Sequence, residues 1–269
     1  MSRLSDAFKN KPVFMPYYPV GYPDMETSID ILEALAKNGA DLIEVGMAFS
    51  DPLADGPVIQ KATQVALENG VTTRKIIAGV IELRKRGVTI PLILMGYTNP
   101  ILSYGFQKFI HDSHHAGADG FIIPDLPSEE SGEFESYLQK TIEPSLPLIT
   151  FLAPTTPNER MELVARKAKG FIYLVSVTGV TGLRSDLPEG LPELVARVRE
   201  HTNVPVCVGF GIGTPEQASA VGAIADGVIV GSACIRAIGE SPKPVQAAAI
   251  FAKTYQKALQ YPGGYNPSN

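Results

Sequence analysis

The chain has 269 residues, of which 45% are hydrophobic and 19% charged, and its formal net charge is −5. This composition excludes an intrinsically disordered protein, because such chains are poor in hydrophobic residues and rich in charge. The mildly acidic balance gives no electrostatic reason to expect nucleic acid or an anionic membrane as a partner. The sequence also lacks a run of about 20 apolar residues, the length that a membrane span needs.

The first residues predict a short amphipathic helix that covers one end of the fold, with Leu4 and Phe8 on its apolar side. This segment has no apolar stretch typical of a secretory signal. Cys207 and Cys234 lie in apolar stretches, as buried free thiols in a reducing compartment do. We therefore expect a cytoplasmic protein.

A weak internal repeat follows along the chain, in which a small residue and a turn precede an apolar run. The repeat occurs as ADLIEVG (40–46), ADGFIIP (118–124), KGFIYLVS (169–176) and ADGVIVGS (225–232). Each apolar run is short and flanked by turn residues, which is typical of a strand buried on both faces. Each also follows a stretch with helical spacing, so the repeat predicts alternating helices and strands.

The alternation extends over the whole chain. Strands are expected around 13–18, 42–46, 91–95, 120–123, 147–151, 171–175, 205–209 and 227–230. Helices are expected at 25–38, 57–69, 72–86, 104–116, 130–141, 158–168, 191–201, 215–222 and 243–260. Eight such units favour a parallel sheet closed into a single (β/α)8 barrel, with a doubly wound open sheet as the alternative.

The barrel domain is expected to span residues 1–261, and the apolar-poor tail 262–269 is expected to be disordered. In such a barrel, the chemistry belongs to the loops at the carboxyl ends of the strands. The loops with unusual residues are therefore candidates for the functional site.

Two carboxylates stand at the second strand. Glu44 lies inside an apolar run, and a buried carboxylate has a raised pKa that suits proton transfer. An ion pair with a cation from a neighbouring strand is the equally weighted alternative. Asp55 follows in a loop before Gly56 and Pro57, where a helix N-cap is the common arrangement. Its position alone favours the cap.

Glycine turns follow the last two strands and predict a phosphate site. Gly209, Gly211 and Gly213 precede a helix start at Thr214, and Gly231 with Ser232 opens another helix. Free backbone N–H groups and the positive helix end favour an anion there, and this position is the recurrent phosphate site of the barrel fold. Tight turns without a ligand are the alternative. A further long segment at 178–189 is expected to form a lid over the site, with disorder without function as the alternative.

His111, His114 and His115 resemble a metal cluster but fall on a helical stretch without HExxH spacing. We interpret them as a solvated helix face and expect no metal site.

Several blocks of the sequence, in the same order, resemble those of tryptophan synthase α subunits. The most specific block is LIEVGMAFSDPLADGP (42–57), in which Ala48 stands where the family usually has Pro. The other blocks are FMPYYPVGYPD (14–24), LILMGYTNPI (92–101), FIIPDLP (121–127), YLVSVTGVTG (173–182) and GFGIGTPEQ (209–217). The resemblance covers essentially the whole chain.

The resemblance implies a role for each matching position. It implies that Glu44 and Asp55 are catalytic. It further implies that the substrate contacts Tyr17, Met95, Tyr97, Tyr173, Thr181 and Phe210, and that its phosphate is bound by Gly182, Gly211, Gly231 and Ser232.

The activity implied is cleavage of indole-3-glycerol phosphate into indole and glyceraldehyde 3-phosphate, a lyase step of tryptophan biosynthesis. No cofactor is expected in this chain, since the pyridoxal phosphate of the complete synthase belongs to the β subunit. Pro52 and Asn99 lie in segments that face that β subunit in the family, so an α2β2 heterotetramer is expected. The alternatives are a stand-alone lyase that releases indole and a non-catalytic phosphate-binding regulator of a β partner.

Overall fold

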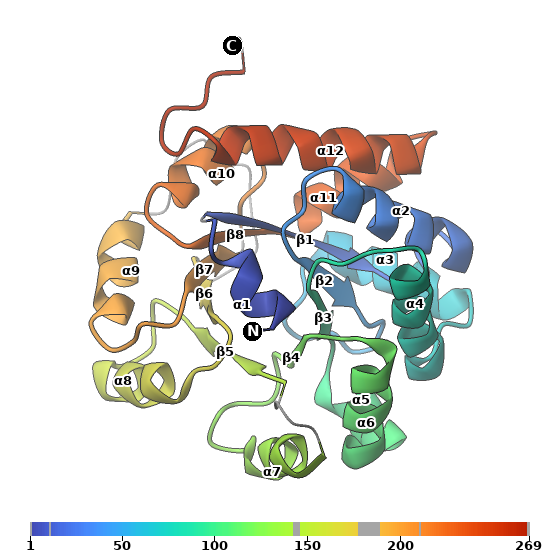
Figure 1. Ribbon diagram of the computed structural model, residues 1–269, viewed down its shortest axis with the longest axis horizontal. Coiled ribbons are helices and arrows are strands. Elements are labelled where there is room, and N and C mark those ends of the chain that lie inside the picture. Colours follow the sequence, from blue (N-terminus) through green and yellow to red (C-terminus); the bar gives the residue numbers. More distant parts are fainter. Residues whose placement is uncertain (1, 11, 142–145, 177–188, 210, 268–269) are drawn as a thin grey trace.

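The computed structural model describes residues 2–10, 12–141, 146–176, 189–209 and 211–267. Eight parallel strands form a closed barrel in which each strand pairs with the next and β8 returns to β1. Figure 1 looks along this barrel and shows the helices arranged around its outside. The strands are β1 (Val13–Pro19), β2 (Ile43–Gly46), β3 (Leu92–Met95), β4 (Gly120–Ile122), β5 (Leu148–Leu152), β6 (Ile172–Val175), β7 (Val206–Gly209) and β8 (Gly227–Val230). The predicted (β/α)8 fold is confirmed, and each strand lies within one or two residues of its expected range.

The strands are three to seven residues long and form the wall between the packed barrel interior and the helical layer. Their residues are almost all buried on both faces, which explains why they appear in the sequence as unbroken apolar runs. The described residues form twelve helices. They are α1 (Arg3–Ala7), α2 (Met25–Lys37), α3 (Pro57–Glu68), α4 (Thr73–Lys85), α5 (Thr98–Tyr104), α6 (Phe106–Ala116), α7 (Gly132–Thr141), α8 (Asn158–Lys167), α9 (Leu191–Arg199), α10 (Pro215–Gly222), α11 (Ser232–Gly239) and α12 (Pro244–Leu259).

The helix α5 was not expected from the sequence as a separate element. Its third residue, Pro100, suggests a loop, yet proline is tolerated in the first turn of a helix, where its missing N–H has no partner to lose. Gly105 separates α5 from α6 with a backbone φ of +91°, a conformation that favours glycine. The predicted helix at 104–116 therefore corresponds to α6 alone.

The short helix α1 covers the amino end of the barrel, as expected. Leu4 and Phe8 are buried, and the Phe8 ring lies 5.9 Å from that of Phe171 at the start of β6. Arg3 donates to the Asp119 carboxylate over 2.9 Å and so links α1 to the strand layer. Figure 1 shows α1 in front of the centre of the barrel.

The internal repeat has a structural cause at this same amino end. Asp41, Asp119 and Asp226 occupy equivalent positions just before β2, β4 and β8. Their carboxylates accept the backbone N–H groups of Phe14, Leu92 and Val206, respectively, over 2.8 to 2.9 Å. Each aspartate therefore fixes its own strand to the preceding one. The remaining copy of the repeat, at 169–176, carries Lys169 where the other three copies carry an aspartate.

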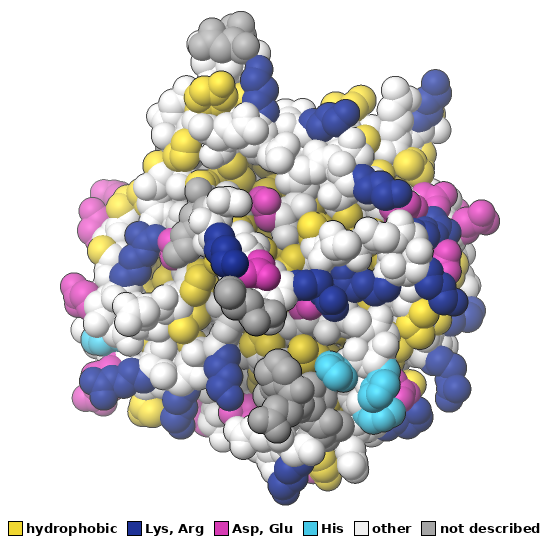
Figure 2. Space-filling view, viewed as in Figure 1, with side chains coloured by type: hydrophobic (Ala, Val, Ile, Leu, Met, Phe, Trp, Pro, Cys, Tyr) yellow, Lys and Arg dark blue, Asp and Glu magenta, His cyan; other side chains and the backbone are white. Residues whose placement is uncertain are grey.

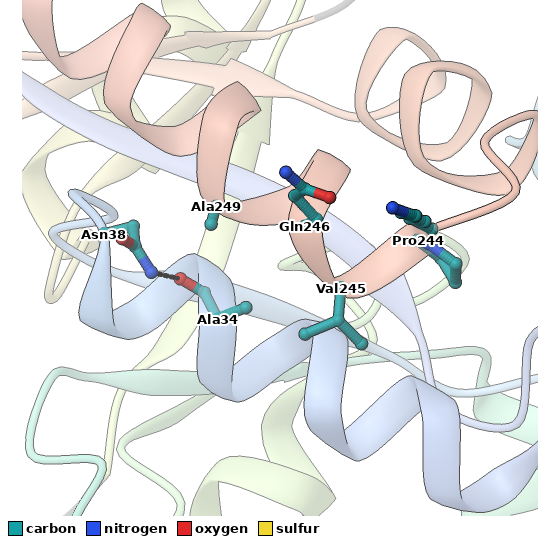
Figure 3. A pocket seen from close by; sticks show the side chains of 7 residues that line it. Ala34, Asn38, Pro244, Val245, Gln246 and Ala249 are labelled. Atoms are coloured by element: carbon teal, nitrogen blue, oxygen red, sulfur yellow. Dashed lines mark hydrogen bonds between the residues drawn. The ribbon is translucent and has the colours of Figure 1, made fainter.

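The last helix, α12, packs across α2 on the outside of the barrel. Between them lies an open groove lined mainly by apolar surface, in which Asn38 donates to the carbonyl of Ala34 over 2.8 Å (Figure 3). None of the predicted site residues lines this groove. Beyond α12, Gly263 and Tyr265 hydrogen-bond to Ser219, and the expected domain limits stay a prediction. No helix within the described ranges is long and apolar enough to cross a membrane.

Candidate active site

The two predicted catalytic carboxylates come from β2 and from the loop that follows it. Glu44 lies within β2, opposite Tyr17 of β1 in the strand register. Asp55 lies just before α3. The charge of Asp55 raises the pKa of Glu44, and both carboxylates raise the pKa of Tyr17 and of Tyr173, so the four side chains share one region of the barrel.

Glu44 is buried and has an unpartnered carboxylate oxygen. The side chain is 1% exposed, and Oε1 has no hydrogen-bond partner among the described residues. Burial, and then the nearby charge of Asp55, raise the pKa of Glu44 from 4.5 to about 8. The alternative of an ion pair with a neighbouring strand is wrong, because no cation in the described part of the chain pairs with Glu44. A carboxyl group in this setting holds a proton at neutral pH and can donate it.

Asp55 is not the N-cap of α3. Gly56 occupies that position, and the helix has no side-chain cap, so the capping interpretation is wrong. The Asp55 carboxylate instead accepts a hydrogen bond from the Tyr97 hydroxyl, while the same hydroxyl accepts the backbone N–H of Ala54 over 3.1 Å. Burial raises the pKa of Asp55 to about 6 against the lowering effect of Tyr97. Asp55 therefore loses its proton at a lower pH than Glu44.

Aromatic side chains surround this pair. Tyr17, Tyr97 and Tyr173 are buried, and burial raises the pKa of each phenol further above its usual range. Glycines make room for two of them. A Cβ at Gly46 would meet Tyr17 Oη at 2.4 Å, and a Cβ at Gly209 would meet Tyr173 Oη at 2.5 Å.

Met95 ends β3 beside Gly46 of β2 and is buried at the same end of the strands. Two aromatic neighbours were missed by the sequence analysis. Phe49 lies 5.5 Å from the Tyr97 ring, and Phe151 stacks on Tyr173 at 4.7 Å between ring centroids. Neither position has a local signal in the sequence, because both contacts join different strands or loops.

The two expected phosphate turns differ in the donors that they leave free. At α10, Thr214 and Gln217 form a capping box, and Gln217 Oε1 accepts the N–H of Gly213 over 2.7 Å. That N–H group is thus already satisfied by the protein. At α11, Gly231 is the N-cap and no side chain caps the helix, which begins at Ser232. As far as the described residues show, no side chain occupies the first-turn N–H groups of α11, which can therefore face an anion.

Gly211 adopts a backbone φ of +81° between β7 and α10. The role of Gln217 was missed, although the spacing Thr-x-x-Gln is the signature of a capping box. Three further predicted residues, Thr181, Gly182 and Phe210, lie outside the described residues, as does most of the expected lid at 178–189. Within the described ranges, no group of three or more metal-ligating side chains comes together.

A parallel barrel with two buried carboxylates of different pKa at the carboxyl ends of its strands, beside a helix start without a side-chain cap, is typical of a barrel enzyme of acid–base chemistry. The comparison with known families specifies which one. The family model described as tryptophan synthase alpha chain matches residues 4–261, and the chain belongs to that family. The predicted fold and lyase activity are thereby confirmed.

Individual relatives agree with this assignment. A tryptophan synthase alpha chain from Dehalococcoides mccartyi is 45% identical over 259 residues, covering 96% of this chain and 100% of the relative. The tryptophan synthase of Saccharomyces cerevisiae is 43% identical over 257 residues, which are 95% of this chain but 35% of that protein. A crystal structure of tryptophan synthase from M. tuberculosis in an aminoacrylate-bound form superposes with a TM-score of 0.85 at 33% identity, covering 96% of this chain and 100% of that one.

Proposed function

We propose that the chain cleaves indole-3-glycerol phosphate by a retro-aldol reaction in which Glu44 transfers protons and Asp55 stabilises charge. The observation that carries this proposal is the difference between the two carboxylates. Burial and the charge of Asp55 raise the pKa of Glu44 to about 8, whereas the pKa of Asp55 is raised only to about 6. Between these values one group is an acid and the other an anion, which is what the reaction requires.

The reaction begins with protonation of the indole ring. Glu44 donates its proton to C3, and the positive charge that develops at the ring nitrogen is stabilised by the Asp55 carboxylate. The Glu44 carboxylate then accepts the proton of the side-chain hydroxyl. As the carbonyl of glyceraldehyde 3-phosphate forms, the C–C bond breaks and its electrons restore the aromatic indole. Glu44 ends protonated and ready for the next cycle.

The substrate phosphate is assigned to the start of α11. The N–H groups that follow Gly231 and include Ser232 have no side-chain cap, and the helix places its positive end there. Gly211 and Gly182 complete the cradle in this proposal. The indole ring is held by the buried aromatic cluster, with Tyr17, Met95 and Tyr173 around it and Tyr97 holding Asp55 in place. The family resemblance adds Thr181 and Phe210, which lie outside the described residues, to the substrate contacts.

No cofactor is required for these proton transfers, and pyridoxal phosphate would belong to a β partner. Exposed apolar side chains support such a partner. Leu53 is 90% exposed beside Pro52, and Leu102 is 57% exposed on the same helix as Asn99. A protein that worked alone would gain nothing from displaying these side chains at the rim of its active site. We therefore favour an α2β2 heterotetramer in the cytoplasm over a stand-alone lyase.

Indole release from indole-3-glycerol phosphate tests the proposal. We expect the Glu44→Gln and Asp55→Asn variants to lose activity by about 10³-fold, because each removes a proton-transfer or charge-stabilising group. Asp51→Asn is the matched control, since Asp51 is an exposed carboxylate in the same loop and its loss should leave the rate unchanged. Addition of a β subunit should raise the rate of the unmodified chain.

The outcomes separate the alternatives. Activity that a β subunit does not change would favour the stand-alone lyase. Full activity in either carboxylate variant would contradict the assigned roles. A folded protein that binds the substrate but releases no indole would indicate the non-catalytic regulator.

A further inference from the structure

Two histidines lie one helical turn apart on the outer surface of α6. His111 and His115 are both exposed, and their ring centroids are 4.1 Å apart with a tilt of 31°. Residues four apart occupy the same face of an α-helix, so this proximity follows from the H-x-x-x-H spacing. The sequence analysis assigned these residues to a solvated helix face. The structure adds which ring nitrogen of each histidine faces a hydrogen-bond acceptor.

One nitrogen of each ring contacts a group that can only accept a hydrogen bond. His115 Nδ1 lies 2.8 Å from the carbonyl oxygen of His111, and His111 Nδ1 lies 3.2 Å from Oδ1 of Asp112. Each Nδ1 must therefore carry the hydrogen, and the neutral ring then has its lone pair on Nε2. The structure records no contact to either Nε2 from the residues that it describes. Both rings thus present an unprotonated nitrogen to solvent.

The Asp112 carboxylate is itself held in place. Its other oxygen, Oδ2, accepts hydrogen bonds from the Tyr104 hydroxyl over 2.7 Å and from Lys108. This arrangement leaves Oδ1 facing His111. Histidines that bind metal ions usually donate Nδ1–H or Nε2–H to a carbonyl or a carboxylate, which fixes the ring and its tautomer. Here Nδ1 of His111 faces a carboxylate, and Nδ1 of His115 faces a backbone carbonyl.

His114 does not belong to this pair. It is half-buried, and its ring is perpendicular to that of His115 with 5.6 Å between centroids. No third imidazole, thiol or carboxylate of the described chain completes a cage. Any ion held here would keep open positions for water or for a group from another molecule.

We propose that His111 and His115 form a two-histidine site for a divalent late transition-metal ion such as Cu²⁺ or Zn²⁺. Imidazole nitrogens bind Zn²⁺ at about 2.0–2.1 Å, so two of them around one ion stand roughly 3 Å apart. The ring centroids are 4.1 Å apart, so the rings must splay about their χ angles until both Nε2 atoms face one ion. The preference among ions follows the general order of stability, in which Cu²⁺ binds most tightly.

The site lies at the end of the barrel opposite the catalytic carboxylates. His111 and His115 are in the last turns of α6, which leads into the amino end of β4, whereas Asp55 follows the carboxyl end of β2. Figure 2, viewed from the side on which α1 lies, shows histidine side chains gathered over this region. Metal binding here should stabilise the folded chain without changing indole release, and the inference does not depend on the proposed function.

Equilibrium dialysis of the untagged protein against Cu²⁺ and, separately, Zn²⁺ tests the proposal. We expect one ion per chain and a rise in the thermal unfolding midpoint when the site is saturated. His111→Ala and His115→Ala should each lower the affinity by about tenfold or more, since one imidazole cannot chelate. Asp112→Ala should weaken binding about tenfold by releasing the His111 ring.

His114→Ala is the matched control, because it removes an imidazole from the same helix but not from the pair. We expect its metal affinity to equal that of the unmodified chain. All the variants alter residues that are exposed or half-buried, and their unfolding curves without metal show whether they fold. The proposal is overturned if His114→Ala weakens binding as much as His115→Ala, or if the double variant of His111 and His115 binds metal as the unmodified chain does.

Discussion

The two ends of the barrel contain carboxylates in contrasting surroundings. At the carboxyl end of the strands, Glu44 is buried with one oxygen unpartnered, and Asp55 has a tyrosine hydroxyl as its side-chain donor. At the amino end, Asp41, Asp119 and Asp226 each accept a backbone N–H from the neighbouring strand. The same kind of side chain is therefore poor in partners at one end of the barrel and links neighbouring strands at the other.

Asp119 shows how completely a structural carboxylate is satisfied. Besides the N–H of Leu92, it receives Arg84 over 2.6 Å and Arg3 over 2.9 Å. Arg84 also donates to the carbonyls of Gly117, Val88 and Ile90. A buried carboxylate without partners has a raised pKa, and this suits it to proton transfer. A buried carboxylate with hydrogen-bond and ion-pair partners instead contributes to the stability of the fold. The following predictions test this division.

The largest effect is expected for Glu44→Gln, which should act in opposite directions on activity and stability. Indole release should fall about 10³-fold, because the proton donor is lost. Burial raises the pKa of Glu44 from 4.5 to about 8, so the unmodified chain loses stability as the pH rises through this interval. Above pH 8 the variant should be more stable by on the order of 4 kcal/mol. Urea unfolding at pH 5, 7 and 9 measures this difference.

Glu68→Gln serves as the control for that prediction. Glu68 is exposed at the end of α3, so its replacement should change neither the rate nor the pH dependence of unfolding. If the stability of Glu44→Gln relative to the unmodified chain does not grow between pH 5 and 9, Glu44 is not buried as an unpartnered acid.

Asp119→Ala should produce the largest loss of stability without a loss of catalysis. The substitution leaves the Arg84 guanidinium without its carboxylate partner, and the N–H of Leu92 without its side-chain acceptor, in a nearly buried setting. Breaking such a pair costs roughly 3 kcal/mol. Asp30→Ala is the control, because Asp30 pairs with Arg86 at the surface and should cost less than about 1 kcal/mol. A normal kcat at a temperature where the Asp119 variant is folded would confirm that this end is structural.

Tyr97→Phe should have an intermediate effect on catalysis. The substitution removes the donor that lowers the pKa of Asp55 and the acceptor for the N–H of Ala54. Asp55 must be ionised to act, so the acidic limb of the rate profile should move upward from about pH 6, and kcat should fall about tenfold. Tyr104→Phe, which alters a tyrosine outside the site, should leave the profile in place. An unmoved acidic limb in Tyr97→Phe would show that Tyr97 does not tune Asp55.

Much of the fold could be predicted from the sequence because its signals are local. Strands buried on both faces produce apolar runs, and helix ends carry residues such as Asp24 and Gly117 that cap them. The helix α5 escaped prediction because its start depends on Asp125, whose carboxylate accepts the N–H and hydroxyl of Thr98 from across the loop between β4 and α7. A contact of that kind has no signature near Thr98.

The candidate active site was harder to predict from local sequence patterns than the fold. Position alone favoured a helix cap for Asp55 and left the role of Glu44 undecided, and only the family resemblance assigned both to catalysis. The structure removes only the two alternatives, because Gly56 is the N-cap of α3 and no cation among the described residues pairs with Glu44. Neither fact can be read from neighbours in the chain. Likewise, the repeated Ala-Asp pair at 40–41, 118–119 and 225–226 was visible as a pattern, but its purpose depends on backbone N–H groups of other strands.

The smallest effect is expected for Asp41→Asn, which tests whether the amino end contains a carboxylate of intermediate character. Asp41 accepts the N–H of Phe14 over 2.8 Å, but unlike Asp119 it has no cation among the described residues. Burial raises the pKa of Asp41 to about 6, so the unmodified chain should lose stability as the pH rises from about 4 to 6.

An asparagine oxygen at position 41 can accept the same N–H without this penalty. The variant should therefore match the unmodified chain near pH 4 and exceed its stability by roughly 1 kcal/mol at pH 7, less than the full shift because Asp41 is partly open to solvent. Urea unfolding at the two pH values measures the difference, and a variant that is less stable at both would show that the charge of Asp41 itself holds β1 to β2.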